Sequence, residues 1–136
     1  MNIDKFKQQH VEILSGITGL RALVKSGIRT NADEIARMIV SMSSTIKLHL
    51  AVEDKVLYPA LKETGDASLA QMGKKYQDEM TSIAHAYLSF ARRWNTPVTL
   101  SSKPEEFRSD ANNVLRVLWD RMRKENTEFY PAIEAY

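Results

Sequence analysis

The sequence contains no cysteine, which excludes disulfide bonds, thiolate metal ligands and thiol catalysis. Glycine and proline are also scarce, with 5 and 4 residues in a chain of 136, and this leaves little room for a turn-rich β fold. The glycine-rich loop that cradles phosphates and the His-Glu-x-x-His helix of many zinc proteases are both missing. These absences favour a helical protein that uses none of those chemistries.

An excess of one charge is missing too, because 19 Lys and Arg residues against 17 Asp and Glu residues give a formal charge of only +2. No dense basic run occurs, so binding to nucleic acid is not indicated. No apolar run nears the roughly 20 residues of a membrane span, and the N-terminus lacks the charged-then-apolar pattern of a signal peptide. We therefore expect a cytoplasmic protein with no membrane or nucleic-acid partner, folded as one domain over residues 1–136.

The sequence does contain four stretches in which apolar residues recur at helical spacing, at about residues 3–25, 31–58, 66–95 and 102–130. Gly27 and Gly65 are predicted to end helices, Pro59 to kink or end its helix, and residues 96–103 to form a polar loop. Four long amphipathic helices with short connections predict an all-α fold, an up-down-up-down antiparallel four-helix bundle.

Three helix starts have candidate capping residues. Asn31 and Ser102 each stand three residues before a glutamate, Glu34 and Glu105, which is the spacing of a capping box. Asp66 is the candidate cap of the third helix.

The second and fourth helices end alike. Glu53 precedes a Leu-Tyr-Pro-Ala segment at the same spacing at which Glu125 precedes a Phe-Tyr-Pro-Ala segment. Four residues before these glutamates stand His49 and Arg121, respectively. The pattern indicates a duplicated two-helix unit in which the second half has lost a histidine.

His49 and Glu53 share one face of their helix, because residues four apart lie nearly above one another. Met42 and Val56 fall on the same face, so the imidazole and the carboxylate are predicted to point into the core. A lone buried carboxylate costs several kcal/mol unless something positive meets it. Either a metal ion or a cationic side chain is therefore expected beside Glu53.

Two further polar residues are predicted to face inward. At about 100° per residue, His10 lies in the middle of the apolar stripe of the first helix, and Glu125 lies within that of the fourth. Arg121 flanks the stripe of the fourth helix, within reach of Glu125. Four potential metal-binding side chains from three helices are thus directed at one region of the core.

The third helix offers no inward histidine at regular spacing. Met80 is central to its apolar stripe, while His85 falls on the opposite side. Either a bulge or a shifted register turns His85 inward, or Met80 occupies the position of the ligand.

A first histidine, then His-x-x-x-Glu before a Leu-Tyr-Pro segment, and then a related second half resemble the hemerythrin-like HHE cation-binding family over nearly the whole chain. The resemblance implies a hemerythrin-like bundle that holds non-heme iron, mono- or dinuclear, or another divalent metal. It implies as metal ligands His10, His49, Glu53, Glu125 and, in the third helix, either His85 or no residue. Arg121 occupies the position of a histidine ligand.

Two functions are expected from these residues. In the first, the metal site binds oxygen or nitric oxide, or reports iron or redox state, and the protein is not an enzyme; a peroxidase-like or nitric-oxide-consuming activity is the catalytic alternative. In the second, Arg121 neutralises Glu53 and Glu125 without any ion, and the bundle is a metal-free interaction module.

Overall fold

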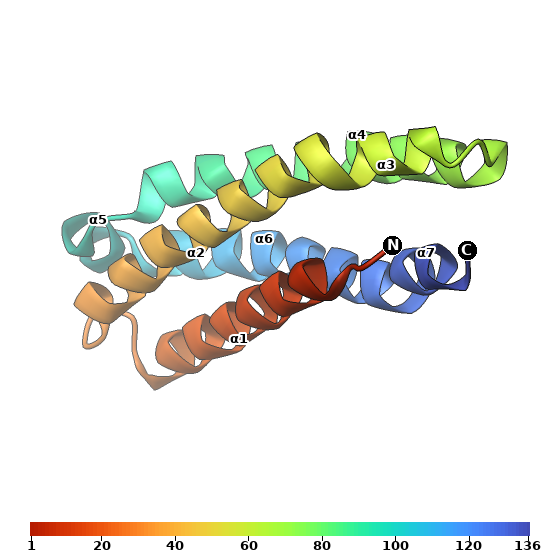
Figure 1. The fold of residues 1–136 in the computed structure, drawn as a ribbon. Coiled ribbons are helices and arrows are strands. Elements are labelled where there is room, and N and C mark those ends of the chain that lie inside the picture. Colours follow the sequence, from red (N-terminus) through yellow and green to blue (C-terminus); the bar gives the residue numbers. More distant parts are fainter.

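The structure of the protein is a computed structural model that describes residues 1–136, and all of its regular structure is helical. Four long helices form the predicted all-α bundle (Figure 1): α1 (Asp4–Ser26), α2 (Ala32–Val52), α4 (Ala67–Trp94) and α6 (Pro104–Lys124). Helix α1 packs against α2, α2 against α4, α4 against α6, and α6 returns to α1.

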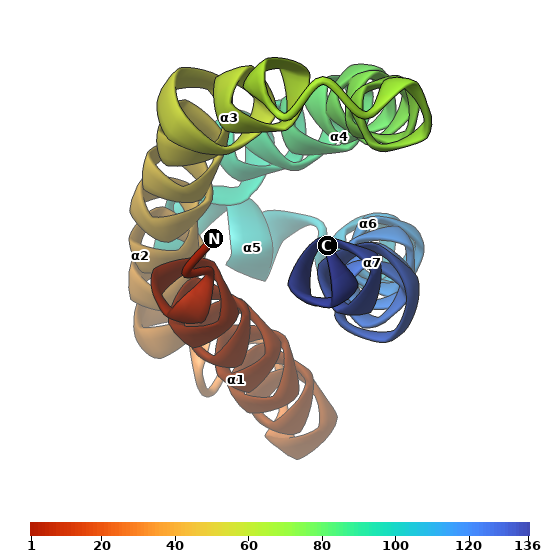
Figure 2. The same ribbon diagram turned by 45° about the vertical axis from the view of Figure 1, so that its right-hand side comes forward.

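Consecutive long helices run in opposite directions, as predicted. Both termini and the short helix α3 (Tyr58–Glu63) lie at one end of the bundle (Figures 1 and 2), and the α1–α2 connection and the short helix α5 (Pro97–Ser102) lie at the other. The end of α2, the start of α1 and the end of α6 therefore meet at the same level.

Two π-helical turns continue α2 and α6 and lead into short terminal helices: η1 (Glu53–Leu57), followed by α3, and η2 (Glu125–Phe129), followed by α7 (Tyr130–Ala135). Each turn begins at one of the two glutamates that end the repeated pattern. A π turn accommodates one more residue than an α turn and so rotates the side chains that follow. Leu57 is consequently buried and Val56 is 56% exposed, so the predicted inward position of Val56 is wrong.

Of the two alternatives for Pro59, a kink or an end of the helix, the end is wrong, because the chain stays helical to Glu63. Pro59 lies in the first turn of α3, where a missing N–H is tolerated. The predicted stops at Gly27 and Gly65 are confirmed, and both glycines adopt a positive φ, 132° and 78°, that other residues rarely take.

Of the three predicted caps, only Asp66 is confirmed, since its carboxylate accepts a hydrogen bond from the Leu69 N–H. The Asn31 amide instead donates to the carbonyls of Leu23 and Gly27, and so secures the end of α1. Ser102 belongs to α5, where its hydroxyl donates to the Val98 carbonyl.

The predicted polar loop at residues 96–103 is wrong as well, because most of it forms α5. The Thr96 side chain accepts a hydrogen bond from the Thr99 N–H, and Pro97 stands in the first turn, where proline is favourable. Leu100 is fully buried in the core. Burial of this one leucine holds a segment whose composition is otherwise typical of a loop.

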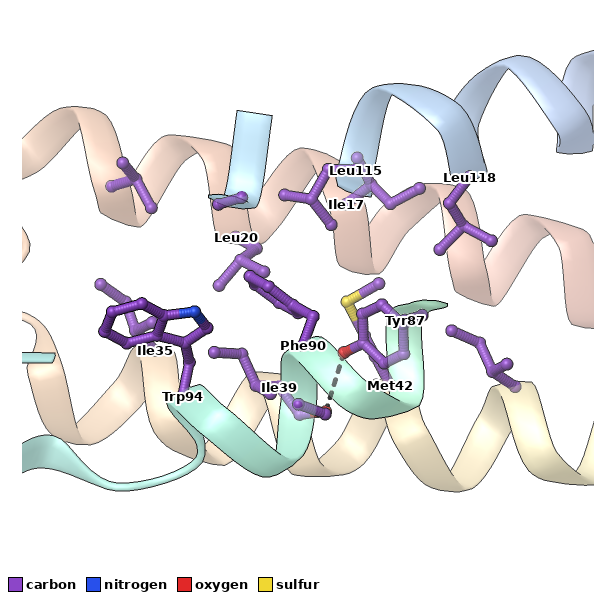
Figure 3. Close-up of a cluster of buried hydrophobic side chains, with 14 of the residues drawn as sticks. Ile17, Leu20, Ile35, Ile39, Met42, Tyr87, Phe90, Trp94, Leu115 and Leu118 are labelled. Atoms are coloured by element: carbon purple, nitrogen blue, oxygen red, sulfur yellow. Dashed lines mark hydrogen bonds between the residues drawn. The ribbon is translucent and has the colours of Figure 1, made fainter. Parts of the chain in front are cut away.

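The larger of two apolar clusters fills the bundle between the middle of α1 and α5 (Figure 3). Trp94 packs edge-on against Phe107, with ring centroids 5.4 Å apart. The Tyr87 hydroxyl donates to the Ile39 carbonyl at 2.9 Å, so this buried polar group is satisfied (Figure 3). Each large side chain buried here contributes about 1.5–3 kcal/mol.

A smaller apolar cluster lies at the end that carries the termini; it includes Phe6, Leu61, Tyr76, Phe129 and Ile133. Along α1, α2 and α6, the residues between the two clusters are polar yet buried. We call this group the polar layer, and its members are His10, His49, Glu53, Arg121 and Glu125.

By length and composition alone, the helical stretch Ala32–Glu63 is apolar enough to cross a membrane. In the structure one face of this stretch, which includes Ile35, Ile39 and Ile46, is fully buried in the core of the bundle. A core helix passes the same compositional test, so the stretch is weak evidence for a membrane span.

Candidate metal centre

Three helices and two π turns supply the polar layer. His10 comes from the second turn of α1, His49 from the last turn of α2 and Arg121 from the last turn of α6. Glu53 and Glu125 are the first residues of η1 and η2, respectively. Because π turns frequently occur at functional sites, two of them that start at matched glutamates mark this level of the bundle.

The two histidines face each other through the same ring nitrogen. The Nε2 atoms of His10 and His49 are 3.2 Å apart. His10 Nε2 is also 2.9 Å from Glu125 Oε1, and His49 Nε2 is 3.3 Å from Glu53 Oε1. One ligand atom from each of His10, His49 and Glu125 lies within 4.8 Å of the others, which is close enough to hold one metal ion.

The other ring nitrogens are bonded to amides. His49 Nδ1 donates to Gln9 Oε1 at 2.6 Å, and His10 Nδ1 donates to Asn126 Oδ1 at 2.8 Å. The Tyr130 hydroxyl lies 2.9 Å from His10 Nε2, within hydrogen-bond distance. Both imidazoles are thus held from behind, with Nε2 directed into the polar layer.

Arg121 lies where the sequence predicted, within reach of Glu125. Its Nε donates to Glu125 Oε2 at 2.7 Å, its Nη1 to Glu79 Oε1 at 3.3 Å, and its Nη2 to the carbonyl of Tyr76. The guanidinium also lies 4.5 Å from the centre of the Tyr76 ring, a cation–π distance. No ion pair joins Arg121 to Glu53.

Glu53 is fully buried, and neither of its carboxylate oxygens has a hydrogen-bond partner. Glu125 Oε1 and the Tyr58 hydroxyl are likewise buried without a partner. His49 is near Glu53, but the contact lacks the geometry of a hydrogen bond. An unpaired acid costs several kcal/mol, so the layer has a specific place that lacks positive charge.

The protonation of the layer follows from burial and from its charges. Burial, reinforced by the charge of Glu125, raises the pKa of Glu53 well above its usual value. Burial alone would also raise the pKa of Glu125, but His10 and Arg121 outweigh it and hold that pKa below its usual value. Burial, with the neighbouring His10, lowers the pKa of His49 to about 3, so its ring is neutral at physiological pH.

His85 is exposed on α4, which is regular from Ala67 to Trp94, so no bulge turns it towards the polar layer. Met80 is the residue that faces inward there, and it is fully buried in the larger apolar cluster. The structure therefore places His85 outside the polar layer, and α4 meets the layer through Glu79 and Tyr76, which both contact Arg121.

Gln9 and Asn126 were not predicted from the sequence. Gln9 lies outside the stripe centred on His10, yet it is buried, and it stands four residues before the buried Ile13. Residues four apart share a face of a helix, so this spacing is the sequence signal that indicates burial of Gln9. Asn126 is exposed and carries no signal beyond its place next to Glu125.

The fold and the polar layer define an antiparallel four-helix bundle with a buried histidine–carboxylate centre. The chain belongs to the hemerythrin HHE cation-binding domain family, whose family model matches residues 1–133. Searches of curated proteins and of solved structures found no match.

The residues of the layer fit a cation. Imidazole and carboxylate groups suit iron, manganese and zinc, and the unpartnered oxygens of Glu53 and Glu125 border the two Nε2 atoms. His10, His49 and Glu125 would hold the ion, and Glu53 lies beside them.

Proposed function

We propose that this protein binds one non-heme iron ion in the polar layer and uses it to bind oxygen or nitric oxide, or to report iron or redox state. The observation that supports this most strongly is Glu53, a fully buried carboxylate whose two oxygens have no hydrogen-bond donor. A cation beside His49 would neutralise it.

Charge accounting favours a metal in addition to the arginine. Glu53 and Glu125 bring two acids into the layer, and Arg121 brings one fixed positive charge. The guanidinium donates to Glu125, Glu79 and the Tyr76 carbonyl, so it pairs with Glu125 and leaves Glu53 without a direct partner. A proton or a metal ion has to supply the remaining charge.

The same contacts favour one ion over two. Glu125 Oε2 is occupied by Arg121, so only Oε1 faces the histidines, and Glu125 cannot use both oxygens to bridge a pair of metals. On α4 the residue that faces inward is Met80, so no α4 histidine is present there to bind a second metal. Arg121 therefore stands in for the second metal of the family as a permanent cation.

Iron bound here would supply an open coordination position and a change of redox state. The chain itself provides the surroundings: apolar side chains above and below the layer keep water out. The buried Tyr58 hydroxyl has no partner and is available as a donor to a small ligand. A surface pocket between α4 and α6 is lined in part by Glu79 and Arg121. We assign a binding or sensing role in the cytoplasm rather than catalysis.

The second candidate function is a metal-free interaction module, and the contacts of Arg121 favour it. In that case Glu53 stays protonated, the guanidinium holds Glu125, and the bundle presents its surface to a protein partner. Both functions share the structure and differ in one quantity, the metal content.

The test is metal analysis of protein expressed with added iron and purified under mild conditions. We expect about one iron per chain in the parent protein and a large loss in His49→Ala. His85→Ala is the matched control, since it removes an exposed histidine and should keep the iron. Less than about 0.2 metal per chain in the parent, or equal content in His49→Ala, would support the metal-free module instead.

A further inference from the structure

We propose that Gln9 is the positioning residue of His49: its amide oxygen fixes the imidazole proton on Nδ1 and so keeps Nε2 as an open nitrogen directed into the polar layer. The inference deepens the proposed metal site, because it identifies what prepares one of its ligands. It concerns the metal-free protein, where it can be tested by itself.

The contact is short and buried. Gln9 Oε1 lies 2.6 Å from His49 Nδ1, Gln9 is 5% exposed, and His49 is fully buried. An amide oxygen has lone pairs and no proton, so it can only accept. The hydrogen at this contact therefore belongs to His49 Nδ1. A neutral imidazole carries only one ring hydrogen, so when that hydrogen is on Nδ1 the Nε2 atom carries a lone pair.

Packing alone does not select one of the two neutral tautomers of His49. The His49 ring lies edge-on to Phe6 and His10, with centroids 6.3 and 4.8 Å away. Such contacts fix the plane of an imidazole but are indifferent to which nitrogen carries the proton, because the two neutral tautomers have the same shape. The hydrogen bond to Gln9 distinguishes them.

The bond also joins two helices at the level of the site. Gln9 precedes His10 on α1, and His49 lies in the last turn of α2. One segment of α1 therefore supplies a potential ligand, His10, and the partner that orients a second potential ligand, His49. If the amide were lost, the His49 proton could move to Nε2, and a metal would have to displace it before binding.

A neutral acceptor suits this position. A carboxylate would also accept from Nδ1, but it would add a third acid to a layer in which Glu53 already lacks a partner. Glutamine provides the acceptor without the charge. Asn126 makes the corresponding bond to His10 Nδ1. Because Asn126 is exposed, water can replace its amide, whereas water cannot replace that of the buried Gln9.

The experiment is nitrogen-15 NMR of the imidazoles in metal-free protein at about pH 8, where neutral rings report their tautomers. The chain has only 3 histidines, and His85 serves as a solvent-exposed reference. We expect His49 to show the Nδ1–H form in the parent and in Gln8→Met, which alters the exposed neighbour. Gln9→Met, which keeps the volume and removes the acceptor, should show the Nε2–H form or a mixture, and Gln9→Glu, which keeps an acceptor, should restore Nδ1–H.

Iron affinity is the second measurement. Loss of an outer hydrogen-bond partner typically lowers metal affinity by about 10–100-fold, and we expect a loss in that range for Gln9→Met and no change for Gln8→Met. An Nε2–H signal for His49 in the parent protein would overturn the inference, as would a Gln9→Met protein with unchanged tautomer and iron affinity. Absence of iron binding with an intact Nδ1–H signal would instead overturn the proposed function and leave the role of Gln9 confirmed.

Discussion

At the scale of single residues, the polar layer contains an acid that lowers the stability of the metal-free protein. Arg121 donates a hydrogen bond to Glu125, whereas Glu53 is buried beside two imidazoles and has no hydrogen-bond donor for either oxygen. A protein selected for stability alone would replace such an acid with an uncharged side chain. Its presence at the first residue of a π turn supports a role in holding a cation.

Glu53→Gln should therefore stabilise the metal-free protein and abolish metal binding. The folded pKa of Glu53 is raised, so the unfolded chain loses this proton near pH 4.5 while the folded chain retains it. Stability that Glu53 contributes at low pH is consequently lost as pH rises above 4.5 towards the folded pKa. We expect Glu53→Gln to gain about 1–3 kcal/mol at neutral pH and little at acidic pH, measured by urea unfolding.

The control for that change is Glu12→Gln, which removes an exposed acid from α1 and should alter stability little at either pH. A Glu53→Gln protein that is less stable than the parent at neutral pH would show that the carboxylate is compensated without a metal.

At the scale of elements, each helix performs one task at the polar layer. The π turns η1 and η2 turn Glu53 and Glu125 inward and carry the chain past Pro59 and Pro131 without a break. Helix α1 approaches α2 closely enough for Gln9 to reach His49, and two glycines, Gly16 and Gly19, face methionines of α2 at that interface.

These two glycines should respond oppositely to alanine. A Cβ at Gly16 would lie 2.9 Å from Met42 Cγ, an atom close to the backbone in a buried side chain. A Cβ at Gly19 would instead clash with the terminal Cε of Met38, at 2.7 Å. Met38 is half-buried and can move its end, so Gly19→Ala should gain up to about 1 kcal/mol from helix propensity. Gly16→Ala should lose about 1–3 kcal/mol through overpacking.

Thermal unfolding of both variants checks this, and each serves as the control of the other because both change the same helix. Equal shifts in the melting temperature would contradict the inference that Met38 can move away from a new Cβ and Met42 cannot.

At the scale of the whole molecule, two apolar clusters enclose one polar layer. The clusters supply the burial that stabilises the bundle, and they also create the low-dielectric environment in which the acids of the layer need a cation. Stability and metal binding are therefore coupled through the same interior.

Metal binding should raise the melting temperature of the whole domain. A ligand at about 100 times its Kd adds about 2.7 kcal/mol, which corresponds to a rise on the order of 10 °C for a chain of this size. Because Glu53 keeps its proton in the metal-free protein, binding must release that proton, and the rise should be larger at about pH 8 than at about pH 6. Calorimetry with iron and then with chelator measures it, and a similar rise in His49→Ala would place the metal elsewhere.

Much of this molecule could be predicted from its sequence. The four helices, their antiparallel order and the inward direction of His10, His49, Glu53 and Glu125 follow from helical spacing, which is a property of each segment by itself. The stops at Gly27 and Gly65 were predictable for the same local reason. The predictions for Val56, for a helix end at Pro59 and for the loop at residues 96–103 failed where a π turn or the burial of Leu100 outweighed local preference.

The sequence by itself determined that acids and imidazoles lie in one core, because amphipathic spacing over a few turns decides which face of a helix is buried. The tertiary structure alone decided which atoms meet: Arg121 reaches Glu125 but not Glu53, Gln9 holds His49, and His85 stays in solvent. The physical reason is that contacts between helices depend on their relative rotation and register. Packing and the two π turns set both quantities, and no pattern within a single helix contains them.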